Sequence, residues 1–253
     1  MTSLSGRVAL ITGGSRGIGR AAVLALAATG AKVAINYAHK EADARQTAEA
    51  VAQLGGDAWL VRGDVGEEAT VEAIFQGTRD HFGRLDIFVS CAVLPVARTV
   101  LEMTSDDWER TMRVNARAFL LGSRLAAAGM REGFGRIIAL SSTGTHFVRN
   151  LRYAPLAMAK GAVEAAVRFL AVELAPRGIT VNVVAPGPTN TEAFDAMAGG
   201  DPAQLRAGLA ARTPMGRLGE PQDSARLIAF LCSEEAQWIT GQLIFSDGGY
   251  SLR

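Results

Sequence analysis

Cysteine is scarce in this sequence, and its scarcity excludes several kinds of protein. Only Cys91 and Cys232 are present, far apart in the chain, and their spacing matches no zinc-binding pattern. We therefore expect no disulfide framework and no metal site. Two thiols and no recognisable signal peptide are typical of a reducing compartment, so a cytoplasmic location is the expectation.

Long apolar runs, low-complexity segments and a large net charge are also missing. No stretch approaches the roughly 20 consecutive apolar residues of a membrane-spanning helix. The net charge of +1 gives no reason to expect nucleic acid or an anionic membrane as a partner. With 49% hydrophobic and 20% charged residues, and without a linker or a repeat, the chain is expected to form one globular domain over residues 1–253.

Short β-branched segments alternate with longer alanine-rich segments along the chain. The short segments are uninterrupted hydrophobic runs, which is the pattern of strands buried on both faces. The repeated strand–helix order predicts a parallel sheet covered by helices. The expected strands are 8–12, 32–36, 58–62, 87–90, 136–141, 180–184 and 243–246. The expected helices are 20–29, 41–54, 67–82, a stretch from about 106 towards 130, 154–175 and 220–231. Ligands of such sheets bind beyond the carboxyl ends of the strands.

A glycine-rich turn follows the first expected strand. Residues 12–19 read Thr-Gly-Gly-Ser-Arg-Gly-Ile-Gly. Glycine has no Cβ, so the backbone can approach a pyrophosphate closely, and the next helix offers unpaired N–H groups and the positive end of its dipole. Between a first strand and a first helix, this turn predicts a dinucleotide site; a tight turn without a ligand is the alternative.

The spacing Gly-x-x-x-Gly-x-Gly resembles that of the short-chain dehydrogenase/reductase family. Matching segments lie between Arg7 and Gly249 and include Asp64-Val65, Asn115, Ser141, Lys160, Pro186-Gly187 and Asp247-Gly248-Gly249. The resemblance implies a single doubly wound, Rossmann-type α/β domain with a seven-stranded parallel sheet. It also implies an oxidoreductase that uses a nicotinamide cofactor.

The end of the second expected strand indicates which cofactor is used. Enzymes that prefer NAD usually place an acid there, on the ribose 2′-hydroxyl. This chain has no carboxylate before Glu41, and it offers Arg16, His39 and Lys40 as cationic donors for a 2′-phosphate. We therefore predict NADPH, although His39 and Lys40 could also belong to a solvated loop.

The remaining cofactor contacts follow from the motif and the family resemblance. Thr189 and Thr191 are expected to hydrogen-bond the carboxamide and the phosphate. The full set of expected cofactor-binding residues is Gly13, Ser15, Arg16, Gly17, Ile18, Gly19, His39, Lys40, Asp64, Val65, Ala92, Lys160, Pro186, Gly187, Thr189 and Thr191.

The long helix expected at 154–175 carries an altered catalytic motif. Most members of the family have Tyr-x-x-x-Lys, but Leu156 stands four residues before Lys160 and cannot donate a proton. The nearest tyrosine is Tyr153, and seven residues are almost two helical turns, so Tyr153 and Lys160 share one face about 10 Å apart along the axis. Pro155 fits the first turn of the helix, where its missing N–H costs nothing.

This longer spacing favours double-bond reduction. In an enoyl thioester the hydride goes to the β-carbon while negative charge develops on the carbonyl oxygen, so the group that stabilises this oxygen must reach further from the nicotinamide. Tyr-x6-Lys also resembles the enoyl-acyl-carrier-protein reductases of the family. By that resemblance Tyr153 stabilises the enolate oxygen, Lys160 binds the nicotinamide ribose, and the lysine ammonium lowers the pKa of the phenol.

Two further catalytic residues are expected from the resemblance. Ser141 occupies the family's Ser-x-x-Gly position, with Ser142 beside it as an alternative hydroxyl. Asn115 matches the asparagine that holds an ordered water and shapes its helix. Ser90 and Cys91 depart from the usual Asn-Asn pair, which puts the substrate in doubt.

The segment 192–212 is interpreted as a substrate lid, with a pair of surface helices as the alternative. Small residues at 157–166 and 126–128 favour close helix packing between subunits, and we expect a homotetramer.

Three functions are compatible with these residues. The first is NADPH-dependent reduction of an enoyl thioester on acyl carrier protein or coenzyme A. The second is reduction of a 3-ketoacyl or polyketide-type carbonyl, and the third is a non-catalytic dinucleotide sensor or scaffold.

Overall fold

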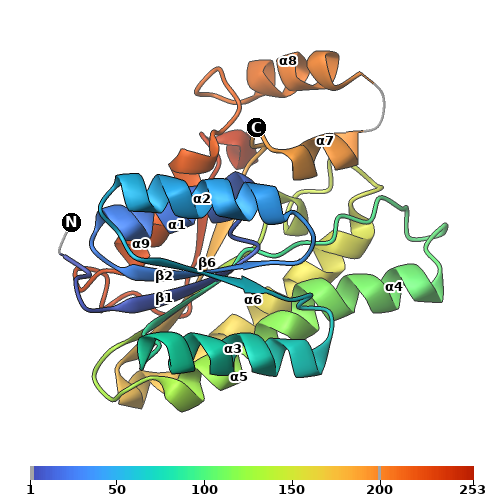
Figure 1. Cartoon of the computed structure of the whole chain (residues 1–253). Coiled ribbons are helices and arrows are strands. Elements are labelled where there is room, and N and C mark those ends of the chain that lie inside the picture. Colours follow the sequence, from blue (N-terminus) through green and yellow to red (C-terminus); the bar gives the residue numbers. More distant parts are fainter. Residues whose placement is uncertain (1–2, 199–200) are drawn as a thin grey trace.

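A parallel sheet forms the centre of the computed structural model, which describes residues 3–198 and 201–253 (Figure 1). In the described residues the sheet has seven strands in the order β3-β2-β1-β4-β5-β6-β7. The strands are β1 (Val8–Thr12), β2 (Lys32–Tyr37), β3 (Ala58–Arg62), β4 (Ile87–Ser90), β5 (Gly135–Leu140), β6 (Ile179–Pro186) and β7 (Leu243–Ser246). Each neighbouring pair is parallel. The predicted fold class is confirmed.

Helices cover both faces of this sheet. They are α1 (Gly17–Ala28), α2 (Glu41–Gln53), α3 (Glu68–Phe82), α4 (Ser105–Met112), α5 (Ala118–Gly129), α6 (Ala154–Leu174), α7 (Glu192–Ala198), α8 (Pro202–Arg212) and α9 (Pro221–Leu231). Figure 1 shows α1, α2 and α9 on one face, α3 and α5 on the other, and α7 with α8 beyond the edge of the sheet. Among the described helices, none has the length and apolar character needed to cross a membrane.

Strand β1 shows why the short hydrophobic runs become central strands. All five of its residues are buried. Val8 and Leu10 belong to the core under α3, α5 and α6, whereas Ala9 and Ile11 belong to the core under α1 and α9. Successive side chains of a strand point to opposite faces, so a strand between two helical layers is apolar at every position.

The stretch expected as one helix from about 106 towards 130 is divided in the structure. Between α4 and α5 lies a π-helical turn, Arg113–Arg117. The buried side chain of Asn115 lies in this turn, and its Nδ2 donates to the carbonyls of Thr111 (2.9 Å) and Leu94 (3.2 Å). A bulge of this kind places a side chain where a regular helix would not, and such bulges are frequent at functional sites.

The connections place a crevice at the middle of the sheet. The chain runs from β1 outward to β2 and β3, and then returns to β4 on the other side of β1. The last residues of the two central strands, Thr12 and Ser90, are in register. Loops leaving such a switch point diverge, and ligands of open α/β sheets bind between them.

Candidate active site

The glycine turn lies directly against the end of β4. A Cβ added to Gly13 would stand 2.8 Å from the Cα of Ala92, and one added to Gly19 would stand 2.1 Å from the carbonyl oxygen of Gly13. Gly13 and Gly17 both have positive φ, at 65° and 53°. The turn therefore brings Gly13, Gly19 and Ala92 close together at the start of α1, whose first N–H groups have no partner within the helix. Their contacts with a cofactor stay a prediction.

Hydrogen bonds with residues of β2 and α2 hold the rest of the turn in place. Gly14 N donates to the carbonyl of Asn36 at 3.0 Å, and the carbonyl of Ser15 accepts from the Thr47 hydroxyl at 3.0 Å. Ile18 is half-buried and packs on the core beneath α1. These contacts hold the turn as one rigid loop at the end of β1.

The end of β2 carries no acid that could accept from a ribose hydroxyl. The buried amide of Asn36 donates to the carbonyls of Val61 and Gly63, so it ties β2 to β3. His39 and Lys40 follow on the surface. Lys40 and Arg16 converge on one carboxylate, that of Glu192 at the start of α7.

Asp64 and Val65 follow β3, and Val65 lines a small cavity together with Thr12, Ser90 and Ala92. Val65 is buried, and the carboxylate of exposed Asp64 accepts from Gly66 N at 2.8 Å. At the end of β6, a Cβ on Gly187 would lie 2.7 Å from that of Asp247. Thr189 donates to the carbonyl of Gly187 at 2.9 Å.

The hydroxyl of Thr191 has a local role in the structure. It accepts from Phe194 N at 3.2 Å, inside the first turn of α7. The expected hydrogen bonds of Thr189 and Thr191 to a cofactor stay predictions, as do the contacts of Pro186 and Gly187.

Tyr153 stands at the N-terminus of α6, against the loop that follows β5. Its ring lies over Gly144, where an added Cβ would be 2.6 Å from two ring carbons. Burial raises the pKa of Tyr153; a hydrogen bond with the Ser142 side chain lowers it, and the charge of Glu164 raises it further. The net shift is upward, so the expectation that the phenol pKa is lowered was wrong, because burial outweighs the favourable contacts.

Lys160 lies buried on the same helix, with 6% of its surface exposed. Burial lowers its pKa to about 8, although interactions with Cys91 and Glu164 act to raise it. Leu156, four residues before Lys160, is 4% exposed and belongs to the buried apolar residues. Since burial also raises the pKa of the Cys91 thiol to about 12, Cys91 stays protonated beside the lysine.

Glu164, one turn beyond Lys160, is a buried carboxylate that the sequence prediction missed. It accepts from the hydroxyls of Ser141 and Thr145, the latter at 2.8 Å, and lies 2.9 Å from Nε2 of His146. Ser141 is therefore turned towards Glu164, and the hydroxyl beside Tyr153 is that of Ser142. The four-residue spacing from Lys160 placed Glu164 on the catalytic face of the helix and could have identified it.

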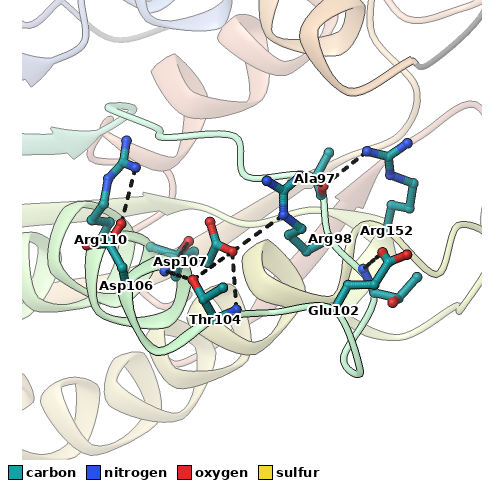
Figure 2. Close-up of polar contacts among 10 residues, drawn as sticks. Ala97, Arg98, Glu102, Thr104, Asp106, Asp107, Arg110 and Arg152 are labelled. Atoms are coloured by element: carbon teal, nitrogen blue, oxygen red, sulfur yellow. Dashed lines mark hydrogen bonds and ion pairs between the residues drawn. The ribbon is translucent and has the colours of Figure 1, made fainter.

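The loop after β4 supports the backbone at Tyr153. Asn115 accepts from Leu94 N at 3.2 Å, at the beginning of this loop. Further along, Arg98 N donates to the carbonyl of Arg152 at 2.9 Å, and Arg98 forms a β-bridge with Tyr153. Figure 2 shows the side chain of Arg152 reaching the carbonyl of Ala97 (3.3 Å). Arg152, the residue before Tyr153, is thus held in place through both its backbone and its side chain.

The start of α4 anchors the other end of this loop (Figure 2). Thr104 accepts from Asp107 N at 3.1 Å, while the Asp107 carboxylate accepts from Thr104 N, which is a reciprocal capping box. The same carboxylate lies 3.5 Å from Nε of Arg98. Helix α4 and the backbone of Tyr153 are therefore connected through Arg98.

No group of three or more His, Cys, Asp or Glu side chains within the described ranges is arranged to hold a metal ion. The groups that can take part in a reaction at the carboxyl end of the sheet are hydroxyl, ammonium and backbone N–H groups.

Comparison with known proteins identifies the family of this chain. A family model described as Enoyl-(Acyl carrier protein) reductase matches residues 13–251. An uncharacterized oxidoreductase of Methylorubrum extorquens is 40% identical over 249 residues, covering 98% of this chain and 99% of that protein. A hydroxynaphthalene reductase-like protein of Metarhizium majus is 37% identical over 256 residues (98% and 96%). The versicolorin reductase of Emericella nidulans is 38% identical over 255 residues (97% and 96%).

Solved structures of the same shape agree. A short-chain dehydrogenase/reductase from Serratia marcescens superposes with a TM-score of 0.91 at 37% identity, covering 98% of this chain and 99% of that one. A short-chain dehydrogenase from Burkholderia cenocepacia in complex with NADP gives 0.91 at 35% identity (98% and 99%). The promiscuous reductase LugOII, which catalyses keto-reduction at C1 during lugdunomycin biosynthesis, gives 0.90 at 37% identity (100% and 100%). This chain, an oxidoreductase by its fold and relatives, belongs to the short-chain dehydrogenase/reductase family.

Proposed function

We propose that the protein is an NADPH-dependent carbonyl reductase in which Tyr153 and Ser142 bind the oxygen of a ketone. The observation that carries this proposal is the position of two hydroxyl side chains at Gly144: the Tyr153 ring packs on this glycine, and the Ser142 hydroxyl accepts from its N–H at 3.0 Å. Lys160, whose side chain is buried, lies on α6, the helix that begins directly after Tyr153. Two adjacent hydroxyl donors can stabilise the negative charge that develops on one carbonyl oxygen during reduction.

The residues at the crevice fit NADPH. The close approach of Gly13 to Ala92 leaves a cradle of backbone for the pyrophosphate, and Arg16 and Lys40 offer cations for the 2′-phosphate. The NADP complex of the Burkholderia cenocepacia relative supports this assignment. When bound, the cofactor supplies the hydride.

The protein's own groups supply the proton. Because its pKa is raised, the phenol of Tyr153 is protonated at neutral pH and can donate its Oη proton to the carbonyl oxygen. Ser142 keeps the phenol oriented and shares the developing charge. In this proposal the buried ammonium of Lys160 binds the nicotinamide ribose.

The relatives of this chain favour a ketone of the polyketide type as the substrate. A hydroxynaphthalene reductase-like protein, a versicolorin reductase and an enzyme of keto-reduction all match nearly the whole chain. Reduction of an enoyl thioester is the second candidate, because Tyr153 stands seven residues before Lys160 and the matching family model is described as an enoyl reductase. Reduction of a 3-ketoacyl thioester is a carbonyl reduction and therefore belongs to the first candidate function.

The substrate class can be tested by following NADPH oxidation at 340 nm. We expect turnover with a fused-ring aromatic ketone and with acetoacetyl coenzyme A as the small thioester, and little with crotonyl coenzyme A. Turnover of crotonyl coenzyme A alone would transfer the proposal to the enoyl reductase. Tight NADPH binding without turnover of any of the three would favour a non-catalytic sensor.

We also propose that α7 and α8 form a lid over the substrate. A separate proposal concerns assembly: the chain forms a homotetramer. On α6, Phe169 and Val172 are 73% and 77% exposed, and Leu120 of the neighbouring α5 is also exposed. Exposed large apolar side chains on adjoining helices indicate a surface that another copy covers.

Assembly is tested with Phe169→Glu, which places a charge on that surface. Light scattering is expected to show a tetramer for the wild type and a smaller species for the variant. Leu54→Glu, at another exposed position directly after α2, serves as the control and should leave the mass unchanged. A monomeric wild type would contradict the proposal.

A further inference from the structure

The two cations assigned to the cofactor phosphate already have an anionic partner. Glu192, the first residue of α7, contacts the guanidinium of Arg16, and the same oxygen lies 3.2 Å from Nζ of Lys40. We propose that Glu192 weakens the binding of NADPH but not that of NADH: its carboxylate occupies the place of the 2′-phosphate, and NADPH must displace it. This inference rests on the proposed use of NADPH.

The carboxylate matches the ligand that it replaces. Arg16 and Lys40 come from different loops, after β1 and β2, yet they meet at one oxygen, as they would on a phosphate. The hydrogen bond from Lys40 and the charge of Arg16 lower the pKa of Glu192, so its charge persists through the neutral range. Nearby Arg45 is held by Glu41 through two hydrogen bonds, so it is already paired within α2.

The contact is weak enough to be exchanged. Arg16 and Glu192 are 49% and 59% exposed at their side chains, and Lys40 is 53% exposed. Ion pairs this open to water contribute little to stability. A phosphate carries about twice the charge of a carboxylate and has three acceptor oxygens, so it binds both cations more strongly than the Glu192 carboxylate does.

Displacement of Glu192 also acts on the proposed lid. Thr191 and Glu192 begin α7, and the Thr191 side chain lies beside Gly17, 3.5 Å from the position of an added Cβ. When a phosphate takes Arg16 and Lys40, Glu192 is left beside a like charge. The exposed Glu192 side chain then turns into solvent, and the ion pairs that join α7 to the loops after β1 and β2 are lost.

The test measures binding of NADPH and NADH by fluorescence titration, which needs no substrate. In Glu192→Gln the dissociation constant of NADPH is expected to fall about three- to tenfold at low salt, whereas that of NADH changes less than about twofold. The gain should shrink as salt rises, because exposed charges are screened. Glu192→Ala is expected to behave like the glutamine variant.

A matched control lies in the same helix. Asp195 pairs with Arg206 of α8, and Asp195→Asn makes the same chemical change three residues further on. It should leave both dissociation constants unchanged. An equal change for both cofactors, or the same change in Asp195→Asn, would overturn the inference. If the wild type binds NADPH tightly and Glu192→Gln has the same dissociation constant, this inference alone is overturned. If the wild type fails to bind NADPH, the proposed function is overturned as well.

Discussion

Tyr153→Phe is expected to lower kcat at least about a hundredfold on the substrate of the wild type, with no loss of NADPH binding. General acid catalysis by a positioned side chain typically contributes two to four orders of magnitude. The substitution removes the hydroxyl beside Ser142 and leaves the ring that packs on Gly144. Single-turnover rates together with NADPH titrations separate the loss of chemistry from any loss of binding.

Two controls make this prediction specific. Tyr250→Phe is the same change at another buried tyrosine, whose ring packs against Arg149, and it should keep normal activity. Ser142→Ala is expected to lose more activity than Ser141→Ala, because Ser141 donates to Glu164 rather than to the tyrosine. Normal turnover in Tyr153→Phe would remove the tyrosine from the mechanism and with it the proposed assignment.

The fold could be predicted from local sequence because its signals are local. The unbroken apolar run of β1 is required by burial on two faces, and the glycines after it are required by backbone contacts as short as 2.1 Å to an added Cβ. The π-helical turn at Asn115 could not be predicted, since it depends on hydrogen bonds to Leu94, 21 residues away. Hydrophobic periodicity carries no information about such a contact.

The site was predicted less completely than the fold. The motif placed Tyr153 and Lys160 on one helix; in the structure Lys160 lies on α6 and Tyr153 is the residue directly before this helix. It did not show which of two adjacent serines faces the tyrosine, because this depends on a buried carboxylate, Glu164, that draws Ser141 away. The spacing also favoured an enoyl substrate, whereas one relative of known structure, LugOII, catalyses a keto-reduction. Spacing along a helix fixes the distance between two side chains but leaves the substrate undetermined.

Replacing Lys160 by methionine is expected to have two opposite effects. Activity should fall at least about a hundredfold in kcat/KM, because the ammonium proposed to position the nicotinamide ribose is lost. Stability at pH 7 should rise by about 2–3 kcal/mol, because a buried ammonium whose pKa is about 8 rather than 10.5 is replaced by an apolar chain of similar length. Urea unfolding and initial rates on the same samples measure both effects.

The pH dependence distinguishes a buried charge from altered packing. Between pH 8 and 10.5 the native lysine is neutral while the unfolded chain still binds the proton, so wild-type stability rises with pH in this range. The variant lacks this rise, and its advantage should shrink from pH 8 upward. Wild-type kcat/KM should fall above pH 8 as the free enzyme loses the ammonium. A stability difference that stays constant from pH 7 to 10 would contradict a lowered pKa of Lys160 and show that packing alone is responsible.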